Sequence, residues 1–212
     1  MRLFARLAAG ALLLATSLST VAQPMVWQHK VDATINAEFG RDDQGNLYFA
    51  YPTRDLLNSY VKMDKLDANG RLIWSKTIDQ VDVTQNKHVV KQVIFAHDRA
   101  YVLHDFETPT NDLVMSKVQE VDVVEGVSAV ITATDTARYV KMAMHKKGFV
   151  VSRFAPPGVI DGVAGIQWFD LNSHLVGEQS MVGYSGVAGI ACTADGKSAF
   201  IAAKSSDPVD TV

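Results

Sequence analysis

The fold is decided by a short segment that occurs twice, first as VWQHKVD at residues 26–32 and again as IWSKTID at residues 73–79. Apolar, aromatic, polar, β-branched and acidic positions align between the two copies without a gap. An internal repeat of this kind is the sequence signature of a repeat architecture. We therefore expect further copies of the same unit along the chain.

Two further sets of matching positions give the length of the repeat. Aromatic residues inside apolar, strand-like runs recur at intervals of about fifty residues, at Tyr48, Tyr101, Phe149 and Phe200. An apolar residue followed by aspartate ends a predicted strand and opens a turn in three units, at Leu66-Asp67, Val121-Asp122 and Phe169-Asp170. We expect the four aromatic side chains to occupy equivalent places in successive units.

The segments between the predicted strands have the composition of tight turns. Glycine or asparagine, which tolerate a positive φ angle, occurs at 43–46, 67–70 and 194–197. The flanking runs are rich in valine, isoleucine, tyrosine and phenylalanine, as strands are. No amphipathic helical stretch follows residue 22.

Each unit therefore reads as four antiparallel strands, here called a to d. Full units are predicted at 34–79, 88–134 and 137–182, a partial unit of two strands at 187–212, and an additional d strand at 24–32. Four strands at this period predict an all-β fold, a β-propeller of four-stranded antiparallel blades in an incomplete arc of about three and a half blades. A β-sandwich is the alternative, but it does not explain a repeat that includes loop composition.

The first unit carries a resemblance to a known family. DQGNLYF at 43–49 and VKMDKLDANGRLIW at 61–74 resemble the bacterial exported β-propeller repeat of the quinoprotein-like, seven-bladed type. That repeat reads as an Asp-Gly-Asn turn, a strand, a loop, a Lys-x-Asp strand, then glycine and tryptophan. The match is good in the first unit, weak in the next two and partial in the fourth. It implies the fold and export, but no activity, because such repeats share none.

The first 22 residues have the features of a signal peptide. Arg2 and Arg6 precede an apolar stretch at 7–18, and Thr20-Val21-Ala22 presents small side chains for cleavage before Gln23. An uncleaved anchor is the alternative. No later apolar stretch approaches the roughly twenty residues of a membrane helix. The sequence therefore predicts a periplasmic or secreted protein with no membrane span after cleavage of residues 1–22, and with residues 23–212 forming the repeats.

Composition and motifs argue against several classes of function. The net charge of −3 gives no attraction to nucleic acid. With a single cysteine, Cys192, neither an intramolecular disulfide nor a cysteine-based metal site can form. His97 and His104 are the two histidines closest in sequence, but they are predicted at opposite ends of one strand, so no metal site is expected. No catalytic or cofactor-binding motif was found, and we expect no cofactor.

Topology indicates where a binding site would lie. In a four-stranded blade the b–c and d–a loops share one face around the central channel, and loops on a rigid scaffold commonly carry binding residues. An acidic–basic cleft is therefore expected on that face. The candidate binding residues there are Arg54, Asp55, Asp105, Glu107, Asp112, Arg153 and Asp161. The alternative is that these are solvated loop charges.

The function favoured by the sequence is that of an extracytoplasmic, non-enzymatic binding or scaffold module. Its partner is a protein, a glycan or a surface that the sequence does not identify. The alternative is a fragment of a propeller enzyme, hydrolase or quinoprotein-like, whose active site needs further blades. The absence of histidine and carboxylate pairs at matching repeat positions favours the binding module over the enzyme.

Overall fold

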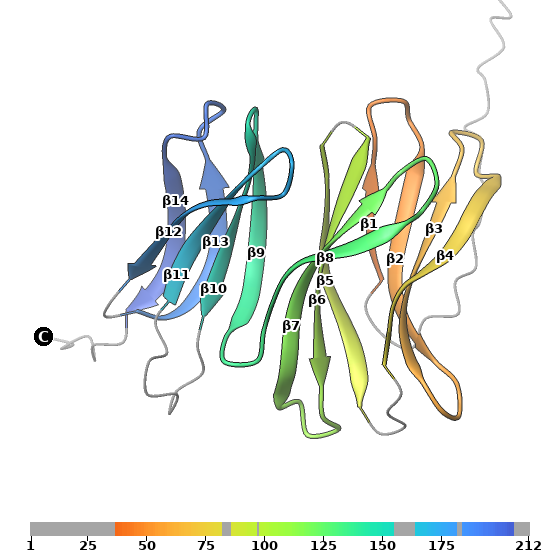
Figure 1. The fold of residues 1–212 in the computed structure, drawn as a ribbon, viewed down its shortest axis with the longest axis horizontal. Helices are drawn as coiled ribbons and strands as arrows, with labels where there is room; N and C mark the ends of the chain where they lie inside the picture. Colours follow the sequence, from red (N-terminus) through yellow and green to blue (C-terminus); the bar gives the residue numbers. More distant parts are fainter. Residues whose placement is uncertain (1–36, 82–85, 97, 155–163, 182–183, 206–212) are drawn as a thin grey trace, which may run out of the picture.

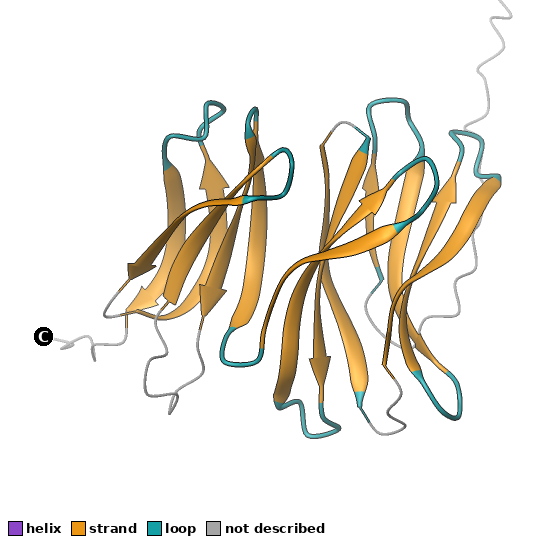
Figure 2. Cartoon of the chain, in the orientation of Figure 1, coloured by secondary structure: helices purple, strands orange, loops and turns teal. Residues whose placement is uncertain are grey.

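The structure is a computed structural model that describes residues 37–81, 86–96, 98–154, 164–181 and 184–205. In this part of the chain all regular secondary structure is β (Figures 1 and 2), in fourteen strands. The predicted signal peptide at 1–22 and the predicted strand at 24–32 lie outside the described residues. Within them, no helix has the length and apolarity needed to cross a membrane.

The strands form consecutive antiparallel sheets in which chain order equals spatial order. The first sheet contains β1 (Glu38–Arg41), β2 (Leu47–Arg54), β3 (Ser59–Leu66) and β4 (Leu72–Val81). The second contains β5 (Lys87–Ala96), β6 (Arg99–Glu107), β7 (Leu113–Asp122) and β8 (Ser128–Thr134). The third contains β9 (Arg138–His145), β10 (Gly148–Phe154), β11 (Ala164–Asp170) and β12 (Leu175–Met181). A two-stranded fourth sheet contains β13 (Tyr184–Cys192) and β14 (Ala199–Ser205).

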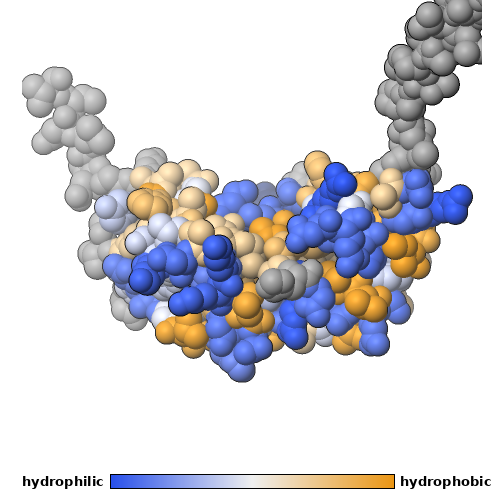
Figure 3. Space-filling model, turned by 90° about the horizontal axis from the view of Figure 1, so that it is seen from above, coloured by the Kyte–Doolittle hydropathy of each residue, from blue (hydrophilic) through white to orange (hydrophobic). Residues whose placement is uncertain are grey.

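The sheets pack face to face as successive blades (Figure 1). The a strands contact one another in series, β1 with β5, β5 with β9 and β9 with β13. Seen from above, the molecule is a crescent hollowed along one side (Figure 3). This is the predicted β-propeller arrangement, and the described residues form an open arc of three four-stranded blades and one two-stranded blade.

The apolar core lies between the blades, because side chains alternate between the two faces of each strand. Tyr48 and Met63 of the first blade pack with Val102 of the second in one cluster. Leu103 of the second blade packs with Phe149 of the third in another. Each large apolar side chain that is fully buried in this way contributes about 1.5–3 kcal/mol. Inter-blade packing therefore holds the arc together.

The predicted ladder of aromatic residues is correct for the side-chain direction of Tyr48, Tyr101 and Phe200. It is wrong for Phe149 of the third unit. Tyr48 and Tyr101 face the following blade, and both are buried. Phe149 instead faces back toward Tyr101, with 4.4 Å between the ring centroids. Phe149 was aligned one residue too early, and a shift of one residue moves a side chain to the opposite face.

Phe200 faces away from the third blade and is 65% exposed. Its neighbours on either side, Ala199 and Ile201, line a pocket against Ile166 and Met181 of the third blade. Because strand side chains alternate, Phe200 lies on the opposite face. It thus keeps the forward orientation of Tyr48 and Tyr101, but no described blade covers it.

The predicted turns are confirmed at their glycines and aspartates. Gly45, Gly70 and Gly196 have φ angles of 88°, 78° and 70°, which glycine adopts without steric cost. At the c–d turns an aspartate side chain accepts two backbone N–H bonds from the residues that follow, at Asp67, Asp122 and Asp170. The repeating apolar–aspartate pair is therefore a turn-forming device shared by three blades.

Candidate functional site

The loops lie at two opposite edges of the arc (Figure 2). In this view the b–c turns at 55–58 and 108–112 and the d–a connection at 135–137 lie at the lower edge, which we call the b–c/d–a edge. The a–b and c–d turns share the other, the a–b/c–d edge. The sequence predicts b–c loops at 51–58 and 104–113, but β2 extends to Arg54 and β6 to Glu107, so both turns are shorter than predicted. Asp105 and Glu107, expected in a loop, lie in β6.

The β2–β3 turn at 55–58 is held rigid by one of the predicted residues. Asp55 Oδ1 accepts hydrogen bonds from the N–H groups of Leu57 and Asn58, both at 2.8 Å, and Oδ2 accepts one from the Tyr60 hydroxyl. The Tyr60 bond, followed by the two backbone bonds, lowers the pKa of Asp55 to about 2. The turn presents Leu56, which is 91% exposed, and Leu57, which is 69% exposed. Sequence reasoning selected Arg54 and Asp55 and missed both leucines.

A second turn at the same edge, at 108–112, is closed by its own polar groups. Asp112 N–H donates to Thr108 Oγ1 at 3.1 Å, and Thr110 Oγ1 donates to Asp112 Oδ2 at 2.5 Å. Asn111 adopts a φ of 69°, which asparagine tolerates better than most residues. The carboxylate of Asp112 therefore shapes its own turn.

Asp105 and Glu107 belong to a network of ion pairs between the second and third blades. Asp105 is fully buried and accepts from Lys91 at 2.6 Å, Arg138 at 3.0 Å and Ser116 Oγ at 2.5 Å. Arg138 also pairs with Glu107. Burial is the main cause of the lowered pKa of Lys91. The charges of Asp105 and Glu107 are thus compensated inside the protein, where they stabilise the contact between blades.

The last two predicted residues are not assembled with the others. Arg153, at the end of β10, pairs with Glu178 of β12 within the third blade. Asp161 lies outside the described residues. The structure therefore groups Arg54 with Asp55 at an exposed turn and Asp105 with Glu107 in a buried network.

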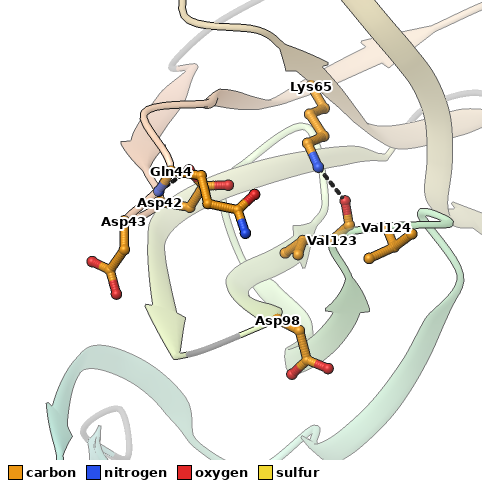
Figure 4. A pocket seen from close by; sticks show the side chains of 7 residues that line it. All are labelled: Asp42, Asp43, Gln44, Lys65, Asp98, Val123 and Val124. Atoms are coloured by element: carbon orange, nitrogen blue, oxygen red, sulfur yellow. Dashed lines mark hydrogen bonds between the residues drawn. The ribbon is translucent and has the colours of Figure 1, made fainter.

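An acidic–basic cleft lies at the edge opposite to the one predicted. A pocket of about 270 Å³ between the first two blades is lined by Asp42, Asp43, Gln44, Lys65, Asp98, Val123 and Val124 (Figure 4). Its one ammonium group, on Lys65, donates to the Val123 carbonyl oxygen at 2.8 Å. The expectation that such a cleft would occupy the b–c/d–a edge is wrong for this pocket. The pocket forms where the a–b turn of the first blade lies beside the c–d turn of the second blade.

A buried histidine pair is the feature that sequence reasoning missed most completely. His88 of β5 and His104 of β6 are almost wholly inaccessible, with ring centroids 5.4 Å apart. Asp79 of β4, in the neighbouring blade, lies with Oδ2 3.6 Å from His104 Nε2. Burial lowers the pKa of both imidazoles below the usual range of histidine.

The two histidines are sixteen positions apart in sequence, so spacing alone does not connect them. The register of the β5–β6 hairpin brings them together. His104 lies opposite Val90, and His88 is on the same face as Val90 two positions away, so the two histidines are diagonal neighbours. The pair considered from the sequence was His104 with His97, and His97 lies outside the described residues.

Comparison with known proteins assigns no family. No family model matches the chain, and no curated protein matches it. Among solved structures, variant and cobalt-substituted forms of the Synechocystis apocarotenoid oxygenase show 10% identity with TM-scores of 0.47 and 0.46. These alignments cover 79% of this chain and 43% of the oxygenase chain. An ACO/RPE65 chimera gives 11% identity and a TM-score of 0.45, covering 74% and 40%. The chain spans less than half of these proteins, and likeness at this level assigns it no activity.

Proposed function

We propose that the chain is an extracytoplasmic, non-enzymatic binding module that holds a protein partner at its b–c/d–a edge. The observation that carries the proposal is the β2–β3 turn, which presents Leu56 and Leu57 to solvent on a backbone fixed by Asp55. Export is supported by the signal-like residues 1–22 and by the resemblance to exported repeats.

A rigid turn that exposes two leucines has the properties of an interface anchor. Adjacent exposed apolar side chains gain free energy when a partner covers them. Because Asp55 already orders the turn, binding need not bear the entropy cost of ordering it. The fitting partner is a protein surface with an apolar recess and, beside it, a carboxylate that pairs with exposed Arg54.

Replacing both leucines by serine should weaken binding of the partner by at least about tenfold, because two anchors are lost. The measurement uses the full chain, expressed with its own leader in a bacterial host, carrying a photo-crosslinking amino acid in place of exposed Gln80, which contacts Asn58 of the turn. We expect a discrete protein adduct that excess unlabelled chain suppresses and excess Leu56→Ser/Leu57→Ser chain does not.

The matched control lies at the opposite edge. Leu175 and Val176 are also adjacent and exposed, Val176 by 64%, so the Leu175→Ser/Val176→Ser chain should compete as well as the unmodified chain. Equal competition by both double variants, the absence of a discrete adduct, or adducts with lipid alone would contradict the proposal.

A further inference from the structure

We propose that Asp79, His88 and His104 form a binding site for a divalent transition-metal ion of the Zn²⁺ class, at the interface of the first two blades. One carboxylate oxygen and one nitrogen from each imidazole lie within 4.8 Å of one another. Zinc binds such ligands at about 2.0–2.2 Å, which places tetrahedral ligand atoms about 3.4 Å apart. Metal binding therefore requires the most widely separated ligand atoms to approach each other by up to about 1.4 Å.

The ring nitrogens of the two histidines provide a second, independent observation that points to a ligand. All four ring nitrogens of His88 and His104 are buried, and within the described part of the chain none makes a hydrogen bond. A buried polar atom left without a hydrogen-bond partner destabilises the folded state. Two neighbouring imidazoles with this property face the carboxylate of a different blade, an arrangement that a metal ion would satisfy.

Two residues of β7 complete the surroundings. Lys117 donates to Asp79 Oδ2 at 2.8 Å, so its ammonium group competes with a metal ion for this carboxylate. Gln119 lies beside His104, and its side-chain oxygen Oε1 is buried. An amide oxygen in that place can accept the remaining imidazole N–H once the metal is bound, which orients the ring. The site is thus held by Lys117 when empty and is completed by Gln119 when full.

The test measures Zn²⁺ binding to the purified full chain by equilibrium dialysis, with Co²⁺ absorption as a probe of tetrahedral coordination. We expect one ion per chain, and a loss of affinity of about 100-fold or more in His88→Ala, His104→Ala and Asp79→Asn. His174→Ala is the matched control, because its side chain is 76% exposed, and it should bind as the unmodified chain does.

Lys117→Met separates a metal site from a merely structural cluster. If the ammonium group competes for Asp79, its removal should raise Zn²⁺ affinity by about tenfold. The asparagine variant at Asp79 preserves side-chain volume, so it remains informative if a histidine variant fails to fold. Absence of stoichiometric Zn²⁺ binding in both the unmodified chain and Lys117→Met would overturn the proposal, as would an equal loss in His174→Ala.

Discussion

Replacing Phe149 by alanine is expected to lower the free energy of unfolding by about 3–5 kcal/mol. The Phe149 ring is fully buried between blades, with its centroid 4.4 Å from that of Tyr101 and 4.9 Å from that of Phe169. Its truncation removes apolar contacts on two sides and leaves a cavity that the β-sheets cannot readily close. The measurement is denaturant unfolding of the variant and the unmodified chain at equilibrium.

Phe200→Ala is the matched control, because the sequence places both residues in one ladder. Phe200 is mostly exposed, so its truncation should change the free energy of unfolding by less than about 0.5 kcal/mol. Similar losses at the two positions would mean that the outer face of β14 is covered, which contradicts the open end of the arc.

The second large effect concerns the ion pairs between the second and third blades. Asp105→Ala is expected to lower the free energy of unfolding by about 3 kcal/mol, because it leaves the partly buried Lys91 without its nearest carboxylate and Arg138 with Glu107 alone. Lys91 and Arg138 both lose the carboxylate that they share, and Ser116 loses its acceptor.

Asp112→Ala is the comparison for this variant, since Asp112 also carries a carboxylate but lies in the exposed turn that it shapes. Its loss should cost no more than about 1 kcal/mol. If Asp112→Ala proved as destabilising as Asp105→Ala, the buried network would stabilise the contact between these blades no more than an exposed turn does. Chemical denaturation of both variants at the same pH decides the matter.

The sequence allowed the strands and their turns to be predicted because their signals are local. Glycine at positive φ and aspartate at the c–d turns act on neighbouring backbone groups, so Gly70 and Asp67 mark one turn without reference to the rest of the chain. The number of strands in each blade followed from these marks and from the repeat length. Local chemistry therefore predicted the fold class correctly.

The direction of a side chain in a strand is not local in this sense. It depends on the alignment of the strands, and an error of one residue in that alignment moves a side chain to the opposite face of the sheet. For this reason the sequence predicts Phe149 on the wrong face of its blade. The same limitation placed Asp105 in a solvated loop, although β6 continues past it and directs it toward Arg138 of the next blade.

The candidate sites depend even more on contacts between blades. The histidine pair needs the β5–β6 register, and Asp79 reaches it from a different sheet. The exposure of Leu56 and Leu57 needs the true length of the β2–β3 turn, which was predicted too long. Neither the histidine pair nor the exposed leucines form a motif of fixed spacing, so neither could be predicted from a single sequence.

Amide hydrogen exchange along β14 tests the open arc most directly. Within the described residues β14 pairs only with β13, whereas β6 is paired on both sides. Alternate β14 amides, those turned away from β13, should therefore exchange rapidly, while the amides of β6 stay protected. Slow exchange at every β14 amide, to the level of β6, would show that another segment, such as residues 24–32, pairs with this strand and closes the ring.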